Sequence, residues 1–208
     1  MNSMHALFLN GSLKPSSEDS NTDALIRKVI NHYEDIGVTS EVIRIADYNI
    51  KPGVEVDMGD GDEWPVIFEK IKKADILIIG TPIWVGEKSS ITSRIIERIN
   101  GGSGETNEEG QSIYYNKIGG VVVTGNEDGG KHAASSVLYA LSHLGFTIPP
   151  NVDTYWVGEA GPGPSYMEAM QEGESEFTNQ HVQWLAYNTA HFAKMLKNSP
   201  IPAIGNKA

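Results

Sequence analysis

The chain has 208 residues, of which 39% are hydrophobic, and this size is typical of one domain that buries roughly 70% of the surface of its unfolded chain. It contains no cysteine, which excludes disulfide bonds, iron–sulfur clusters, thiol nucleophiles and cysteine-based zinc sites. Its formal charge of −11 comes from acidic residues spread along the chain, so the protein should repel nucleic acid and anionic lipid, and an anionic ligand needs a local binding site.

The hydrophobic runs in the chain are short. Residues 6–9 form the apolar run nearest the N-terminus, which is far too short for the hydrophobic part of a signal peptide. No later run approaches the ~20 residues that a membrane-spanning helix needs. We therefore expect a soluble cytoplasmic protein with neither a membrane nor a nucleic-acid partner.

Runs of branched apolar residues alternate with helical periodicity, as in βα units around a parallel sheet. Strands are expected at residues 5–10, 40–46, 74–80, 118–125 and 152–157. Helices are expected at residues 22–36, 62–73, 89–100, 131–144 and 178–198. The runs ILIIG and VVVTG are apolar at every position, so helices should cover both faces of the sheet. The predicted fold is α/β, a doubly wound five-stranded parallel sheet in a single domain spanning residues 1–208.

Several residues mark the expected ends of these elements. Asp62 is a candidate N-cap of the second helix. Gly37 and Gly145 follow the first and fourth helices, where a glycine often ends a helix. The dipeptide Thr81-Pro82 should stop the third strand.

Two segments and the C-terminal tail interrupt the alternation. Residues 100–117 begin with the Gly-rich and acidic stretch NGGSGETNEEGQS and are expected to be a surface excursion. Residues 158–176 are too long for an ordinary connection, so they are expected to be either mobile or a functional flap. The tail, residues 199–208, should lie on the surface or reach a neighbouring subunit.

The loop after the first strand, GSLKPSSEDSNT, is rich in hydroxyl side chains and leads directly into the first helix. In an open parallel sheet, ligands bind at the carboxyl ends of the strands. A helix N-terminus offers unpaired N–H groups and the positive end of the helix dipole, and hydroxyls add neutral donors, so a phosphate dianion could bind here. The alternative is that Ser20, Asn21 or Thr22 merely caps the helix. If phosphate binds, Glu18 and Asp19 must point away from it.

Other nucleotide-binding and catalytic motifs fit less well. A dinucleotide-binding turn needs G-x-G-x-x-G after the first strand, where Gly11 stands alone. The stretch TGNEDGGKH has the spacing of a triphosphate-binding loop, but it ends in His132 and places Glu127 and Asp128 where the phosphates would lie. The stretch GGSGE lacks the last glycine of a nucleophile elbow. The histidines show no metal-ligand spacing, so we expect no metal site.

Two further loops should lie at the same edge of the sheet. After the third strand, TPIWVGEKSS places Trp84 and Val85 on an exposed rim, and Gly86 permits close approach to a flat partner. A buried tryptophan is the alternative interpretation, but a loop position favours a planar ligand. After the fourth strand, TGNEDGG offers amides and backbone N–H groups. A phosphate site, an aromatic wall and a polar loop together suit flavin mononucleotide (FMN).

The chain resembles the flavodoxin-like NAD(P)H-dependent FMN reductases, and among them the multimeric-flavodoxin branch that includes quinone reductases. The resemblance covers about residues 5–157 and lies in three motifs, which are GSLKPSSEDSNT, GTPIWVGEKSSITSRIIERI and VVVTGNEDGGKHAASSVLYALSHLGFTIPP. It implies a flavodoxin-like fold, FMN as cofactor, NADPH or NADH as co-substrate, and a homodimer or homotetramer. The implied cofactor-binding residues are, at the phosphate, Ser12, Lys14, Ser20, Asn21 and Thr22; beside the isoalloxazine ring, Pro82, Ile83, Trp84, Val85 and Gly86; and at its polar edge, Thr124, Gly125, Asn126, Glu127 and Gly130.

In flavin enzymes the cofactor carries the chemistry while the protein binds and orients it, so no catalytic side chain needs to be visible. We expect hydride transfer from NAD(P)H to the flavin, followed by electron transfer to a quinone, a flavin or a similar small acceptor. Backbone N–H groups near residues 124–126 would stabilise the negative charge of the reduced ring. Two alternatives are a flavodoxin-type electron carrier that does not turn over NAD(P)H and a flavin-free binding domain of the same fold.

Overall fold

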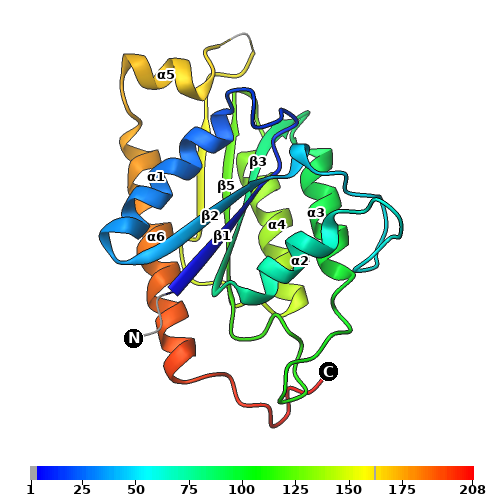
Figure 1. Cartoon of the computed structure of the whole chain (residues 1–208). Helices are drawn as coiled ribbons and strands as arrows, with labels where there is room; N and C mark the ends of the chain where they lie inside the picture. The colour runs from blue at the N-terminus through cyan, green and yellow to red at the C-terminus, as the bar shows by residue number, and fades with distance from the viewer. Residues whose placement is uncertain (1–3, 162) are drawn as a thin grey trace.

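The computed structural model describes residues 4–161 and 163–208, which form an alternating series of strands and helices (Figure 1). The strands are β1 (Met4–Asn10), β2 (Val38–Arg44), β3 (Ile76–Trp84), β4 (Glu87–Lys88), β5 (Ile118–Gly125) and β6 (Asp153–Val157). The α-helices are α1 (Asn21–Asp35), α2 (Trp64–Lys73), α3 (Ser90–Asn100), α4 (Gly130–Leu144), α5 (Tyr166–Glu172) and α6 (Glu176–Asn198). A 3₁₀ turn, Ile45–Asp47, follows β2.

Five of the strands form one parallel sheet in the order β2-β1-β3-β5-β6, and β4 adds a short antiparallel hairpin to β3. The chain moves from β1 to β2 on one side and then returns to β3 on the other side of β1, so the strand order reverses between β1 and β3. This is the flavodoxin-like order, in which ligands bind beside the reversal. The predicted parallel sheet is therefore confirmed, while β4 is a further strand outside the prediction.

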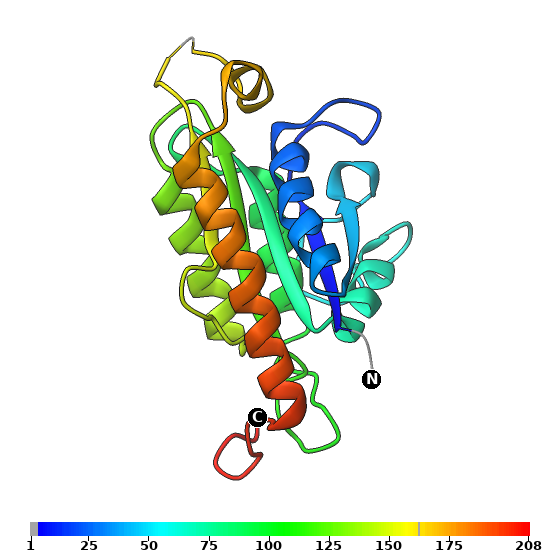
Figure 2. The same ribbon diagram turned by 90° about the vertical axis from the view of Figure 1, so that its left-hand side faces the viewer.

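Helices cover both faces of the sheet, as the all-apolar strands require. Helices α1 and α6 lie on one face and α2, α3 and α4 on the other (Figures 1 and 2). Alternate residues of β1 enter different cores, since Phe8 packs on the α1 and α6 side and Leu9 packs on the opposite side. The structure thus has two hydrophobic layers that hold the sheet between them.

The third strand does not stop at Thr81-Pro82, as the sequence predicts, but continues to Trp84. Pro82 still pairs with Thr124 of β5, while the pairing of β3 with β1 ends at Gly80. One side of β3 is therefore free of its parallel neighbour beyond Gly80, and a residue without an N–H group is tolerated there.

Asp62 is not the N-cap of α2, because the helix begins at Trp64 and Glu63 occupies the cap position. Its carboxylate instead lies 2.6 Å from Nη2 of Arg98, and both side chains are fully buried. Arg98 also donates to the backbone carbonyls of Lys51, Glu55 and Val56. The pair therefore anchors the long connection between β2 and α2 to helix α3.

The remaining helix ends lie close to the expected positions. Gly37 and Gly145 follow α1 and α4 with positive φ values of 73° and 114°, which glycine adopts at low cost. Helix α6 begins two residues earlier than predicted, at Glu176, and Ser175 caps it. Segment 158–176, expected to be either mobile or a functional flap, contains the short helix α5.

The C-terminal tail packs against the excursion at residues 100–117. The backbone N–H of Ile201 donates to Oδ1 of Asn116 at 2.7 Å, and the N–H of Ala208 donates to the carbonyl of Gly110 at 3.0 Å. The tail thus lies on the surface of its own chain. None of the helices in residues 4–161 and 163–208 is both long enough and apolar enough to cross a membrane.

Candidate flavin site

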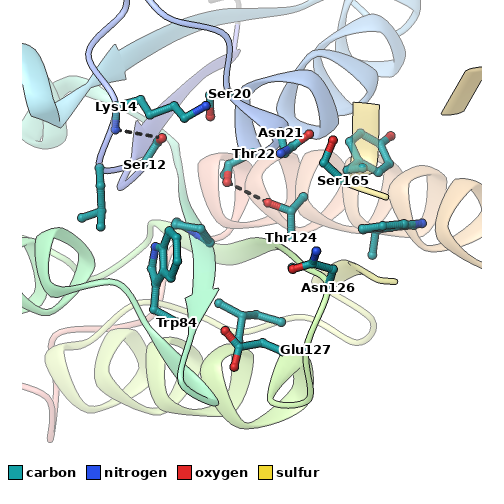
Figure 3. A pocket seen from close by; sticks show the side chains of 16 residues that line it. Ser12, Lys14, Ser20, Asn21, Thr22, Trp84, Thr124, Asn126, Glu127 and Ser165 are labelled. Atoms are coloured by element: carbon teal, nitrogen blue, oxygen red, sulfur yellow. Dashed lines mark hydrogen bonds between the residues drawn. The ribbon is translucent and has the colours of Figure 1, made fainter. Parts of the chain in front are cut away.

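A cleft lies at the carboxyl ends of β1, β3, β5 and β6, next to the reversal of strand order (Figure 3). The residues that line it are Ser12, Leu13, Lys14, Ser20, Asn21, Thr22, Pro82, Ile83, Trp84, Thr124, Gly125, Asn126, Glu127, Trp156, Ser165 and Tyr166. All the predicted site residues therefore meet in one place except Val85, Gly86 and Gly130. That they bind a flavin stays a prediction.

The hydroxyl-rich loop and the start of α1 form one end of the cleft. Ser20 is the N-cap of α1, and its side chain accepts the N–H of Asp23 at 3.2 Å. The side chain of Ser12 accepts the N–H of Lys14 at 3.3 Å, while Ser12, Ser20 and Thr22 are themselves buried. Capping thus accounts for Ser20, and the other hydroxyls remain at the positive end of the α1 dipole. This end of the cleft has the features of an anion site.

Two residues from the end of β2 and the turn after it hold this loop in place. Arg44 is 9% exposed, and its Nη1 donates to the carbonyls of Lys14 and Pro15, each at 3.1 Å. Asp47 accepts the N–H of Ser16 at 2.8 Å, and this backbone hydrogen bond is the main reason that the pKa of Asp47 is lowered. Arg44 thus engages the loop carbonyls, which would repel an anion if they faced one.

Glu18 and Asp19 are exposed and do not line the cleft, as phosphate binding at this loop requires. Lys14 is the only formally positive side chain among the lining residues. Its ammonium group therefore supplies the local positive charge of the cleft, within a protein of formal charge −11.

The turn between β3 and β4 forms the other end of the cleft. Trp84 is 53% exposed, so the expectation of an exposed aromatic rim is confirmed and the buried alternative is wrong. Val85 has a φ of +53° and Gly86 a φ of +78°, the left-handed conformations of a two-residue hairpin turn. Valine rarely adopts this conformation, because its branched Cβ crowds the backbone. Val85 and Gly86 therefore shape the turn that carries Trp84, while they do not themselves line the cleft.

The loop between β5 and α4 supports this turn. The carboxylate of Glu127 accepts the N–H of Val85 at 3.0 Å. Gly129 lies so close to Gly86 that a Cβ at Gly129 would meet the Gly86 carbonyl oxygen at 2.4 Å. Gly130, predicted to contact the ligand, instead starts α4 against Val157, where a Cβ would meet Cγ2 at 2.7 Å. Gly129 and Gly130 thus allow this loop to pack closely against the β3–β4 turn and the end of β6.

The middle of the cleft is crossed by a hydroxyl pair. Oγ1 of Thr22 and Oγ1 of Thr124 lie 2.8 Å apart, and both residues are at most 2% exposed (Figure 3). This contact joins the start of α1 to the end of β5. The proposed phosphate end of the cleft is therefore linked directly to the strand that leads into the third predicted loop.

Four lining residues were not predicted, namely Leu13, Trp156, Ser165 and Tyr166. Trp156 lies at the end of β6, so the carboxyl end of that strand could have been considered with the others. Ser165 and Glu168 form a capping box at the start of α5. The S-x-x-E spacing was a readable signal for a helix inside the 158–176 segment.

Charged side chains of β4 and the start of α4 pair with one another. His132 lies at the start of α4 and contacts Glu87, and Lys88 donates to Glu87 at 3.2 Å. Burial tends to raise the pKa of Glu87, but His132 and Lys88 outweigh it and lower the pKa. Among the residues that the structure describes, no three His, Asp or Glu side chains gather closely enough to hold a metal ion.

Comparison with known proteins identifies relatives that match most of the chain. Residues 4–160 match the family described as NADPH-dependent FMN reductase. The 8-demethyl-8-aminoriboflavin-5'-phosphate synthase of Streptomyces davaonensis is 39% identical over 207 residues, which are 95% of this chain and 80% of that protein. The crystal structure of RosB with the bound intermediate 8-demethyl-8-formylriboflavin-5'-phosphate has a TM-score of 0.88 and 38% identity, and the match covers 96% of this chain and 82% of that one.

Another relative is much longer than this chain. A Mycobacterium bovis protein named divalent metal cation transporter MntH is 45% identical over 199 residues, which are 93% of this chain but 29% of that protein. The chain therefore spans less than a third of that relative, and the activity in that name cannot be assigned to the shared region.

Proposed function

Because the chain belongs to the NADPH-dependent FMN reductase family, we propose that its cleft binds FMN and that it transfers hydride or electrons from NADPH or NADH to a quinone, a flavin or a similar small acceptor. The observation that carries this proposal is the convergence of three predicted loops on one cleft at the reversal of strand order.

The donors at the α1 end of the cleft fit a phosphate ester. A phosphate dianion accepts hydrogen bonds from backbone N–H groups, hydroxyls and ammonium groups. This end of the cleft offers the N-terminus of α1, buried hydroxyls including Ser12 and Thr22, and the single cation Lys14. We propose that Ser12, Lys14, Ser20, Asn21 and Thr22 hold the phosphate.

The opposite end fits a flat ring with a polar edge. Pro82, Ile83 and Trp84 offer apolar and aromatic surface, and Gly125, Asn126 and Glu127, from the end of the neighbouring strand β5 and the loop after it, line the cleft beside them. Bound FMN would supply the hydride-accepting ring. The protein's part is to hold that ring between the two loops and to present backbone N–H groups of residues 124–126 to its polar edge.

The first test is the visible absorbance spectrum of the purified protein with and without added FMN. A protein-induced change in the flavin bands is expected. In a second step, the FMN-loaded protein is mixed with NADPH and with NADH in a stopped-flow instrument. Bleaching of the flavin within seconds supports the reductase. Flavin binding without bleaching would favour the electron carrier, and no flavin binding at all would refute both.

A second candidate function is a reaction on the flavin itself. The relative from Streptomyces davaonensis is named for the synthesis of a modified flavin phosphate, and RosB was solved with a modified flavin phosphate bound. In this case the flavin would be a substrate that leaves the cleft after reaction. Mass spectrometry of the flavin after incubation with the protein distinguishes the two, because a reductase returns FMN with its mass unchanged.

A further inference from the structure

The segment between β6 and α6 lies at the cleft. We name residues 158–161 and 163–175 the cover segment. Its helix α5 lies at the same end of the sheet as the start of α1 (Figures 1 and 2). The family match ends at residue 160, so most of the cover segment lies beyond it. Ser165 and Tyr166 of this segment line the cleft. In the view of Figure 3, Ser165 lies on the opposite side of the Thr22–Thr124 pair from Trp84.

The cover segment is attached to residues proposed to bind the flavin. Oδ1 of Asn21 accepts the N–H of Met167 at 2.9 Å. Nδ2 of Asn126 donates to the carbonyl of Gly163 at 3.1 Å, and the carbonyl of Asn126 accepts the N–H of Gly161 at 3.3 Å. The first residue of α1 and the loop after β5 thus both hold this segment, with α5 next to the cleft.

A second set of contacts holds the far end of the cover segment. Nζ of Lys28, on α1, donates to Glu174 at 2.6 Å and to Asn179 at 3.1 Å. The capping box closes the start of α5, since the N–H of Ser165 donates to Glu168 at 2.8 Å. Contacts before and after Tyr166, the first residue of α5, therefore hold it in position.

Tyr166 carries a buried hydroxyl that lacks a partner. The residue is 2% exposed, and its ring meets the edge of Trp156 with the ring centres 5.5 Å apart. Its hydroxyl oxygen is buried and has no hydrogen-bond partner among the described residues. Burial, followed by the nearby carboxylate of Glu174, raises the pKa of Tyr166 to about 12. The hydroxyl therefore remains protonated at neutral pH and can donate a hydrogen bond.

Buried polar groups in folded proteins are nearly always hydrogen-bonded, so an orphaned hydroxyl on a residue that lines a cleft calls for a partner outside the chain. We propose that the cover segment is a further wall of the flavin site and that the hydroxyl of Tyr166 donates a hydrogen bond to an oxygen atom of the bound flavin. This inference rests on the proposed function, since it assumes that the cleft takes a flavin. It makes Tyr166 a binding residue that the three loop motifs do not contain.

The test compares Tyr166→Phe with Tyr33→Phe. Tyr33 is also a fully buried tyrosine, but its hydroxyl bonds to Thr189 at 2.6 Å, and it does not line the cleft. Dissociation constants for FMN are measured by flavin fluorescence, and the thermal stability of each ligand-free protein is measured by circular dichroism. We expect Tyr166→Phe to weaken FMN binding ~3- to 10-fold, the usual effect of one lost hydrogen bond, without lowering the melting temperature of the ligand-free protein. Tyr33→Phe should lower that melting temperature and leave FMN affinity unchanged.

The outcomes separate this inference from the proposed function. If the wild type does not bind FMN, the proposed function fails. If the wild type binds and Tyr166→Phe binds equally well, only the role of Tyr166 is refuted. Repeating the titration with riboflavin locates the acceptor. A loss for both ligands supports a bond to the ring or the ribityl chain, and a loss for FMN alone supports a bond to the phosphate.

Discussion

The carboxylate of Glu127 accepts the backbone N–H of Val85 at 3.0 Å, and this contact joins the β5–α4 loop to the β3–β4 turn. The turn carries Trp84, which forms one side of the proposed ring site. The width of the cleft at this end therefore depends on Glu127, which the sequence predicts to contact the ligand directly. Glu127 can position the turn whether or not it also touches the flavin.

We expect Glu127→Ala to weaken FMN binding ~10-fold, because loss of this acceptor releases the turn. Glu127→Gln should retain most of the affinity, since an amide oxygen can still accept the N–H of Val85. Asp128→Ala is the matched control, because this neighbouring carboxylate is exposed and its removal changes the charge equally. Fluorescence titration with FMN measures all three. Equal affinities for Glu127→Ala and Asp128→Ala would contradict the positioning role.

The left-handed conformation of Val85 predicts a stabilising substitution. Asparagine tolerates positive φ, and Asn-Gly is the preferred pair in this type of hairpin turn. Val85→Asn should therefore raise the free energy of unfolding by about 1 kcal/mol. Val66→Asn is the control, because Val66 is similarly apolar and 58% exposed but lies in helix α2. Urea denaturation measures both, and equal effects would show that the turn carries no strain.

Arg44 predicts a selective effect on phosphate binding. Its guanidinium holds the carbonyls of the loop that contains Lys14. We expect Arg44→Met to weaken FMN binding ~10-fold while riboflavin, which has no phosphate, binds almost as before. Arg27→Met removes the same charge from an exposed position on α1 and should leave both affinities unchanged. A parallel loss of FMN and riboflavin binding in Arg44→Met would indicate general damage to the cleft.

The buried pair of Asp62 and Arg98 predicts a dependence of stability on pH. Burial alone would raise the pKa of Asp62, but the Arg98 guanidinium and the N–H groups of Met58, Lys51 and Trp64 lower it well below its ordinary range. A carboxylate with a lowered pKa in the folded state contributes stability at neutral pH. That contribution is lost as the pH falls below about 3.9, the ordinary aspartate pKa, toward the lower value in the folded protein.

Asp62→Asn should therefore destabilise the protein by about 3 kcal/mol or more at pH 7, because Arg98 keeps its charge without a partner. The difference from the wild type should shrink as the pH falls below about 4. Asp60→Asn, at an exposed position in the same connection, should change little. Urea denaturation at several pH values measures these differences, and a difference that is independent of pH would contradict the assignment.

Much of the site could be predicted because it depends on local sequence. Hydroxyl residues before Leu25 and glycines after Val123 stand in loops that directly follow apolar runs, and the carboxyl ends of parallel strands share one edge of a sheet. Once the strands are assigned, the loops that follow them are expected to lie together at this edge of the sheet. The positions of Trp84 and Thr124 in one cleft follow from this rule alone.

Other features depend on contacts between residues far apart in the chain. The local sequence predicts Asp62 to be a helix cap, and only the folded structure shows that Arg98 lies beside it. The local sequence predicts that Pro82 ends its strand, and only the pairing with β5 shows that β3 continues past it. Tyr166 begins a short helix that the S-x-x-E spacing signals, but nothing local indicates that this helix lies at the cleft.

The amino-acid sequence alone determined the alternation of strands and helices and the three loops at one edge, since periodicity and turn chemistry are local properties. The tertiary structure decided which side chains close the site, namely Arg44 under the phosphate loop, Glu127 under the turn and Tyr166 in the cover segment. The partners of Arg44 and Glu127 in these roles lie 29 to 42 positions away in the chain. The bond between Met167 and Asn21, which holds the segment that carries Tyr166, spans 146 positions. Such pairings arise from the packing of the whole chain, which no local pattern encodes.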